Sequence, residues 1–223
     1  MLEISGICKK YRKKQVLSGV TLKAEAGECI GIAGGNGCGK TTLLSILAGT
    51  RKADSGSFRA DGRELLGHPK LQAETIAYVP QENPFMEELS AKDNLSLWYR
   101  GDKEAMKRDL ESGPAAMLGV PEFLNVRVGK LSGGMKKRLS IAAALSGKEK
   151  ILILDEPGAA LDLACKELIR SYLQEYVKKG GVVLLASHEM EELSICSKLL
   201  VLKDGKTWEV PQSLTAKELS LRF

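Results

Sequence analysis

A glycine-rich segment of this chain has the composition of a phosphate-binding loop. Residues 34–41 read Gly-Gly-Asn-Gly-Cys-Gly-Lys-Thr and fit the pattern G-x-x-x-x-G-K-[ST]. Glycines let the backbone turn its amides toward phosphate oxygens, where side chains would block the approach. We expect Lys40 to reach the β- and γ-phosphates of a nucleotide and the Thr41 hydroxyl to bind Mg²⁺. The nucleotide contacts expected in this segment are Gly34, Asn36, Gly37, Cys38, Gly39, Lys40, Thr41 and Thr42.

Two adjacent carboxylates follow an apolar strand, which reads Ile-Leu-Ile-Leu over residues 151–154. Asp155 suits the coordination shell of Mg²⁺. Glu156 points to the other side of the chain, so it can orient the water that attacks the γ-phosphate or accept its proton. The alternative is that both are solvated charges at a strand end.

Two further polar side chains follow predicted strands. His188 comes after the apolar run 182–187 and could hydrogen-bond to the γ-phosphate, although a lone histidine is more often a structural polar group. Gln81 ends the strand beginning at Ile76, and its amide could reach the metal or the attacking water. The alternative for Gln81 is an ordinary loop glutamine. The carboxyl ends of parallel strands meet at one rim, so all these groups can converge there.

A second phosphate-binding signature lies elsewhere in the chain. Leu131-Ser132-Gly133-Gly134 is a Ser-Gly-Gly turn that opens a predicted helix, and it can offer a hydroxyl and bare amides to a phosphate. Together with the first loop, it makes an ATP-driven dimer the leading hypothesis.

The elements that position these groups follow from periodicity. Short strands are expected at 2–7, 19–24, 29–33 and 56–60, followed by an inserted helical subdomain over about 84–145 with helices at 91–99, 103–118 and 132–145. Strands at 151–154, 182–186 and 198–202 flank a helix at 163–177. We predict one α/β domain over 1–223: a P-loop NTPase with a mainly parallel central sheet, an N-terminal antiparallel β-subdomain and the helical insert. The sheet-containing core would span about 1–83 and 146–223.

The composition limits the compartment and the kinds of partner that we expect for this chain. The chain has 223 residues, of which 43% are hydrophobic and 27% charged, and no apolar run approaches the roughly 18 residues that a membrane span needs. Five cysteines without a C-x-x-C pair favour a reducing cytoplasm. The net charge of +5 includes a basic run over 9–14, which could touch nucleic acid or be a solvated loop. Aromatic residues make up only 5%, so a nucleic-acid partner is not expected.

The chain resembles the ATP-binding cassette (ABC) family over nearly its full length, in the family's own motif order. That order is an aromatic residue, the P-loop, the glutamine loop, the signature, the acidic strand, the aspartate loop and the switch histidine. The corresponding residues are Tyr11, Gly34 to Thr41, Gln81, Leu131 to Gly134, Ile151 to Glu156, Leu161-Asp162 and His188.

The resemblance implies that Tyr11 stacks on adenine, although a surface tyrosine is an equally good interpretation of that residue. It implies catalytic roles for Glu156, His188, Gln81 and Lys40, and a Mg²⁺ site at Thr41, Gln81 and Asp155. It also implies a head-to-tail dimer in which Ser132, Gly133, Gly134 and Asp162 of one copy close over ATP held by the other. The second copy could be identical or a paralogue.

Two segments depart from the family pattern. Met135 stands where glutamine is usual, and Gly158-Ala159-Ala160 stands where hydroxyl residues are common. Both departures remove hydrogen-bonding side chains, so we expect slower or differently coupled turnover instead of a dead site.

A nucleotide-binding subunit of a membrane transporter is the expected role, with integral membrane permease subunits as separate chains and the protein held at the inner face of the cell membrane. The resemblance implies that a short helix from the permease docks near 81–99, where Phe85 and Trp98 are candidates unless they pack in the core. The chain ends soon after Trp208, which favours export weakly. The alternatives are an ABC ATPase of a soluble assembly complex, such as iron-sulfur scaffold loading, and a module that senses ATP without hydrolysing it.

Overall fold

The computed structural model describes residues 1–147, 149–159 and 161–222. Its N-terminal part forms an antiparallel sheet in the order β2-β1-β4-β5. The strands of this sheet are β1 (Leu2–Tyr11), β2 (Lys14–Ala24), β4 (Ser55–Ala60) and β5 (Arg63–Glu64). Asp61 and Gly62 both have positive φ and make the β4–β5 turn, as the Asp-Gly pair predicts.

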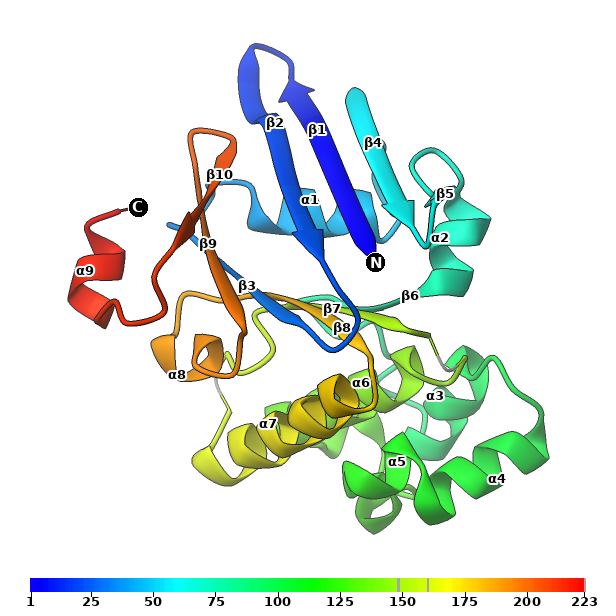
Figure 1. Ribbon diagram of the computed structural model, residues 1–223. Helices are drawn as coiled ribbons and strands as arrows, with labels where there is room; N and C mark the ends of the chain where they lie inside the picture. Colours follow the sequence, from blue (N-terminus) through cyan, green and yellow to red (C-terminus); the bar gives the residue numbers. More distant parts are fainter. Residues whose placement is uncertain (148, 160, 223) are drawn as a thin grey trace.

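A second sheet of six strands forms the centre of the molecule (Figure 1). Its order is β10-β9-β3-β8-β7-β6, and only β10 runs antiparallel to its neighbour. The strands of this sheet are β3 (Cys29–Ala33), β6 (Ile76–Val79), β7 (Ile151–Asp155), β8 (Val182–Ala186), β9 (Lys198–Lys203) and β10 (Lys206–Val210). The predicted mainly parallel sheet is therefore confirmed.

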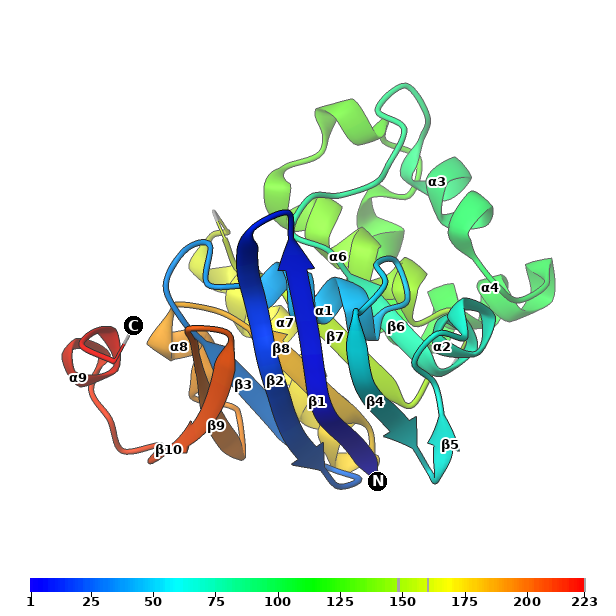
Figure 2. The same cartoon turned by 90° about the horizontal axis from the view of Figure 1, so that it is seen from above.

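The central strands are buried on both faces. In β7, Ile151 and Ile153 pack in one core with helix α1 (Lys40–Leu47) and the antiparallel sheet, whereas Leu152 and Leu154 pack in a second core with the other helices. Figure 2 shows the antiparallel sheet lying over α1, with the helical region to one side. This sandwich explains the continuous apolar runs of these strands.

The helical region lies between β6 and β7, as expected. It comprises α3 (Ala91–Trp98), α4 (Lys103–Ser112), α5 (Pro114–Met117), the 3₁₀ turns η1 (Val120–Phe123) and η2 (Val128–Lys130), and α6 (Gly133–Ala144). The single helix expected over 103–118 was wrong, because Pro114 has no N–H to continue α4 and instead begins α5. The outer boundaries given for this subdomain stay a prediction.

The remaining helices are α2 (Pro69–Thr75), α7 (Leu163–Lys178), α8 (Met190–Leu193) and α9 (Ala216–Ser220). Of these, only α7 was anticipated. The basic run over 9–14 forms the β1–β2 hairpin, in which Lys9 pairs with Asp54 at 2.7 Å. Within the described ranges, no helix combines the length and apolar character needed to cross a membrane.

Candidate nucleotide site

The glycine-rich loop joins β3 to α1, as the motif requires. A Cβ on Gly34 would lie 2.6 Å from the Leu202 carbonyl oxygen, so no larger residue fits there without backbone movement. Gly39 has a φ of 115°, a conformation that L side chains rarely adopt, and precedes the first residue of α1. The loop thus leads into a helix N-terminus whose amides suit an anion.

The residues at the tip of the loop are accessible. Asn36, Gly37 and Thr41 are exposed, and Thr42 is half-buried. Cys38 is also half-buried and packs against the core beneath the antiparallel sheet. Roles of these residues in nucleotide contact stay predictions.

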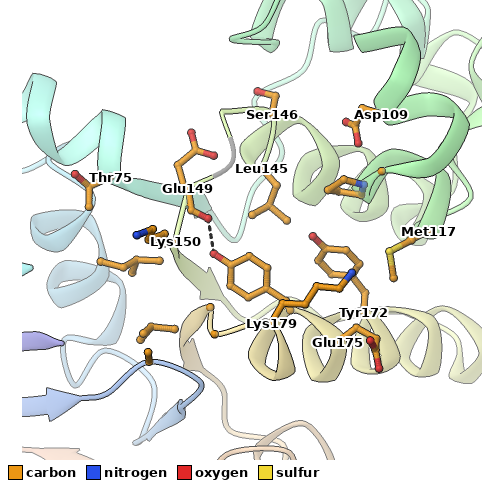
Figure 3. Close-up of a pocket in the computed structure, with 18 of the residues that line it drawn as sticks. Thr75, Asp109, Met117, Leu145, Ser146, Glu149, Lys150, Tyr172, Glu175 and Lys179 are labelled. Atoms are coloured by element: carbon orange, nitrogen blue, oxygen red, sulfur yellow. Dashed lines mark hydrogen bonds between the residues drawn. The ribbon is translucent and has the colours of Figure 1, made fainter. Parts of the chain in front are cut away.

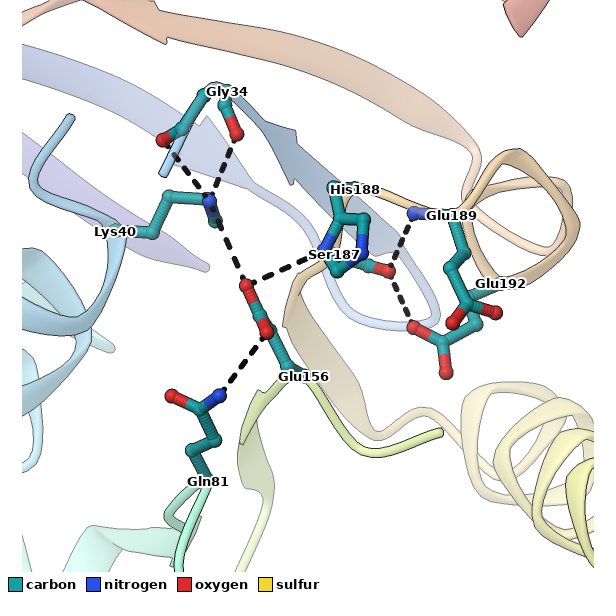
Figure 4. Close-up of polar contacts among 9 residues, drawn as sticks. Gly34, Lys40, Gln81, Glu156, Ser187, His188, Glu189 and Glu192 are labelled. Carbon is teal, nitrogen blue, oxygen red and sulfur yellow. Dashed lines mark hydrogen bonds and ion pairs between the residues drawn. The ribbon is translucent and has the colours of Figure 1, made fainter. Parts of the chain in front are cut away.

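Lys40 is almost fully buried, with 5% of its surface exposed. Its Nζ donates hydrogen bonds to the carbonyl oxygens of Gly34 at 2.8 Å and Gly35 at 3.4 Å, and lies 3.7 Å from Glu156 Oε1 (Figure 4). The ammonium group therefore sits inside the loop, where the β- and γ-phosphates of a nucleotide would be held.

Glu156 is the point on which the polar groups of the rim converge (Figure 4). Its Oε1 lies 3.5 Å from His188 Nδ1, and its Oε2 accepts a hydrogen bond from Gln81 Nε2 at 3.2 Å. The residue has a φ of 46°, which is uncommon for a non-glycine residue, and its amide donates to the Ala186 carbonyl oxygen at 2.9 Å. Such backbone strain is typical of functional sites.

Asp155 could hold a cation. It is 0% exposed, and neither carboxylate oxygen accepts a hydrogen bond from the described residues. Burial raises the pKa of Asp155, while the Lys40 charge acts in the opposite direction. A hard divalent ion would satisfy the two unpaired oxygens, and phosphate oxygens would have to complete its shell, because the described residues include no cluster of three or more His, Cys, Asp or Glu that could hold a metal. Gln81 faces Glu156 through its amide nitrogen, so its expected metal role stays a prediction.

Tyr11 lies at the end of β1. Its hydroxyl accepts a hydrogen bond from Arg51 Nη1, and the charged groups of Arg51 and Lys9 lie 5.4 and 5.5 Å from its ring centroid. These cations lie over the Tyr11 ring, where adenine would have to stack. Stacking of Tyr11 on adenine therefore stays a prediction.

The signature opens α6, as expected. The Ser132 Oγ accepts a hydrogen bond from the Met135 amide at 3.2 Å and caps the helix, while Ser132 and Gly133 are exposed. A Cβ on Gly134 would lie 2.9 Å from Cys165 Sγ, so this glycine lets α6 approach α7 closely. Met135 packs against the core of the helical region, which accounts for an apolar residue at this position.

The signature and the glycine-rich loop are not joined within one chain. Among the described residues, no hydrogen bond or ion pair links Ser132 to Lys40 or its loop. Asp162 is also exposed, and its carboxylate caps α7 by accepting from the Cys165 amide at 2.8 Å. Ala160, one of the residues noted as a departure, lies outside the described residues.

Sequence reasoning did not single out three polar residues beside this rim. Lys137, on α6, is 3% exposed and donates from Nζ to the carbonyl oxygens of Pro80 at 2.9 Å and Gln81 at 3.1 Å. Burial lowers the pKa of Lys137. The other two are Ser187 and Glu192, whose side chains hydrogen-bond to each other beside His188. For Lys137 the sequence did hold a signal, because it shares a helix face with Gly134 and Ile141, which are buried.

A large cavity of about 1030 Å³ lies away from these groups (Figure 3). It adjoins the amino ends of β7 and β8, whereas Glu156 follows the carboxyl end of β7. Asp109 and Glu149 line it, and each has one buried carboxylate oxygen without a hydrogen-bond partner among the described residues. Burial raises the pKa of both carboxyl groups, while an ion pair with Arg100 at 2.6 Å acts in the opposite direction on Glu149. This cavity is not part of the phosphate rim.

Comparison with known proteins agrees with this geometry. The sequence model of the ABC transporter family matches residues 17–159. Nod factor export ATP-binding protein I of Paraburkholderia xenovorans (strain LB400) is 32% identical, covering 98% of this chain and 73% of that protein. Spermidine/putrescine import ATP-binding protein PotA of Mesoplasma florum is 36% identical, covering 94% and 61%.

Solved structures give the same result. The dimeric structure of a bacterial ABC transporter cassette has a TM-score of 0.85 at 28% identity, covering 96% of this chain and 100% of that chain. A dimeric post-hydrolysis cassette bound to ADP and Pi gives a TM-score of 0.85 at 27% identity, with the same coverage. The chain therefore belongs to the ABC transporter family and is an ATP-hydrolysing nucleotide-binding subunit of that family.

Proposed function

We propose that this subunit hydrolyses ATP at Glu156, in a site that a second copy of the chain closes. The observation that carries the proposal is the convergence of Lys40, Gln81 and His188 on Glu156. In this proposal the Glu156 carboxylate accepts the proton of the attacking water, Gln81 orients that water, and His188 hydrogen-bonds to the γ-phosphate. Lys40 offsets the negative charge of the phosphates.

Mg²⁺ would be held by Asp155 and Thr41, with Gln81 completing the protein ligands. The buried, unpaired oxygens of Asp155 support this assignment. When bound, the ion would neutralise phosphate charge that develops during transfer. The Asp155 carboxyl has to be ionised for this role, and a bound cation would favour ionisation.

The exposed signature supports closure by a second copy. Ser132 and Gly133 present a hydroxyl and free amides at the start of α6, and no described contact joins them to the loop of their own chain. A head-to-tail dimer would bring them to the γ-phosphate bound by the partner copy. Two of the solved relatives are described as dimeric.

Coupling to transport is the proposed purpose of this cycle. The relatives are named for export of Nod factor and import of spermidine or putrescine, so separate membrane permease subunits are the expected partners. Near the expected docking segment, Trp98 is 49% exposed and Leu97 60%, whereas Phe85 packs against the helical core. We propose that a short permease helix covers Leu97 and Trp98 and holds the subunit at the inner face of the membrane. Export is the proposed direction, as named for several relatives.

The test is partner capture with the Glu156→Gln variant, tagged and purified from its native cells in mild detergent with Mg-ATP. Mass spectrometry should find a polytopic membrane protein in stoichiometric amount, and Leu97→Ser/Trp98→Ser should lose it. Lys40→Ala is the matched control for dependence on nucleotide. Recovery of soluble scaffold proteins alone would overturn the transport proposal in favour of an assembly ATPase.

A further inference from the structure

Glu192 lies next to Ser187, the residue before His188, and the two side chains are hydrogen-bonded (Figure 4). Its Oε2 accepts a hydrogen bond from Ser187 Oγ, and the same hydroxyl oxygen accepts from the Glu189 amide at 3.0 Å. Burial raises the pKa of Glu192, while the hydrogen bond from Ser187 acts in the opposite direction. Glu192 is therefore hydrogen-bonded to the residue before His188 and packs against Gly158, the second residue after Glu156.

Gly158 has no side chain, and the Glu192 carboxylate lies in the space that a side chain would fill. A Cβ at position 158 would lie 1.7 Å from Glu192 Oε1 and 2.9 Å from its Cδ. A side chain at 158 and the present position of Glu192 thus exclude each other. The absence of a side chain at 158 therefore leaves room for the half-buried Glu192 carboxylate.

The segments that carry Ser187 and Gly158 must keep a fixed distance for the site to work. Glu156 Oε1 and His188 Nδ1 are 3.5 Å apart, and His188 is 49% exposed, so few contacts of its own restrain it. The short helix α8, which carries Glu192, begins two residues after His188. The contacts of Glu192 with Ser187 and Gly158 restrain both loops where the sheet ends.

We propose that Glu192 is a positioning residue that fixes His188 relative to Glu156. This inference rests on the proposed roles of Glu156 and His188. It predicts that positions 158 and 192 are energetically coupled, because each occupies space that the other would need.

The test is a double-mutant cycle with Glu192→Ala, Gly158→Thr and the two combined. Glu192→Ala should lower kcat for ATP hydrolysis between about tenfold and a hundredfold, because small displacements of reacting groups carry penalties of that order. The Kd for ATP should stay within about twofold, since the glycine-rich loop is untouched. Gly158→Thr should displace the Glu192 carboxylate and so lower kcat as Glu192→Ala does, but it should cost little further in the Glu192→Ala background.

Two comparisons separate positioning from folding. Glu191→Ala removes the neighbouring exposed glutamate and should leave kcat unchanged. Glu192→Gln keeps the shape and an acceptor oxygen, so it should recover most of the activity lost in Glu192→Ala.

Equal penalties of Gly158→Thr in both backgrounds, or a wild-type kcat in Glu192→Ala, would overturn the inference. Parallel loss of ATP affinity and thermal stability with kcat would also overturn it, because that pattern is purely structural. Failure of the proposed function is distinguishable, since Glu156→Gln and His188→Ala would then hydrolyse ATP at the wild-type rate.

Discussion

Glu156 combines an unusual backbone conformation with contacts to three polar side chains. Its φ of 46° aims the carboxylate at Lys40, Gln81 and His188 instead of continuing the strand. The Lys40 ammonium donates hydrogen bonds to carbonyl oxygens of its own loop. To bind a phosphate, it has to exchange these for stronger hydrogen bonds to charged phosphate oxygens. The residue that strains the backbone is thus the one proposed to act on water.

Removing the Glu156 carboxylate should slow ATP hydrolysis strongly and leave ATP binding intact. For Glu156→Gln we expect kcat to fall by roughly 10²–10⁴, the range for loss of a general base. The Kd for ATP, measured with a fluorescent analogue, should change little. Lys40→Ala serves as the opposite case and should weaken binding itself. Turnover within a few-fold of wild type in Glu156→Gln would contradict the assignment.

The two buried carboxyl groups of the distant cavity give a pH dependence of stability. Burial raises the pKa of Asp109, so between the unfolded and folded pKa values the native state keeps a proton that the unfolded chain loses. The free energy of unfolding should therefore fall as pH rises through this range. Asp109→Asn keeps an oxygen for the Ala115 amide and removes this slope.

Urea unfolding from about pH 3.5, below the unfolded pKa of Asp, to about pH 7.5 measures how the free energies of unfolding of wild type and Asp109→Asn differ with pH. The gain of Asp109→Asn over wild type should grow with pH, toward about 1.4 kcal/mol for each unit by which the folded pKa is raised. Glu111→Gln, at an exposed position of the same helix, should show no such growth. Curves for Asp109→Asn and wild type that stay parallel across the range would refute it.

At the scale of elements, α6 is joined to the glutamine loop. The buried Lys137 ammonium spans from the signature helix to the carbonyl oxygens of Pro80 and Gln81. If a partner's nucleotide binds Ser132 as proposed, any rotation of α6 would move the Gln81 backbone. We therefore expect Lys137 to couple the signature to the Gln81–Glu156 contact of the same chain.

Lys137→Met should break that link while keeping most of the packing. We expect a loss of about 1–3 kcal/mol in stability, because the carbonyl groups of Pro80 and Gln81 lose their donor. We also expect a fall in kcat larger than any change in ATP affinity, as measured by steady-state kinetics and equilibrium binding. Lys136→Met removes only a surface ion pair with Glu87 and should be nearly silent. A Lys137→Met enzyme with normal kcat would show that the link is structural only.

Elements with strong local signals could be predicted from the sequence. Hydrophobic periodicity and the positions of glycine residues predict three such features. They are the strand, loop and helix around Lys40, the apolar strands before Glu156 and His188, and α7. The short helices α2, α8 and α9 could not, since a helix of four to seven residues carries little periodic pattern. The roles of Lys137 and Glu192 depend on which loops the fold places beside them, which no local pattern encodes.

At the scale of the whole molecule, two sets of residues proposed to bind nucleotide lie apart in the chain. The loop, Asp155 and Glu156 gather at the rim of the central sheet, while Ser132 and Gly133 are exposed at the start of α6. The central claim is that ATP joins two such chains head to tail, and that hydrolysis requires the pair.

The most direct test measures the mass of the chain in solution with bound nucleotide, by light scattering after size exclusion. The account predicts that Glu156→Gln doubles in mass with Mg-ATP but not with ADP, and that Ser132→Arg abolishes the doubling while ATP still binds. Hydrolysis by the wild-type chain at a strictly monomeric mass, with ATP saturating, would contradict it.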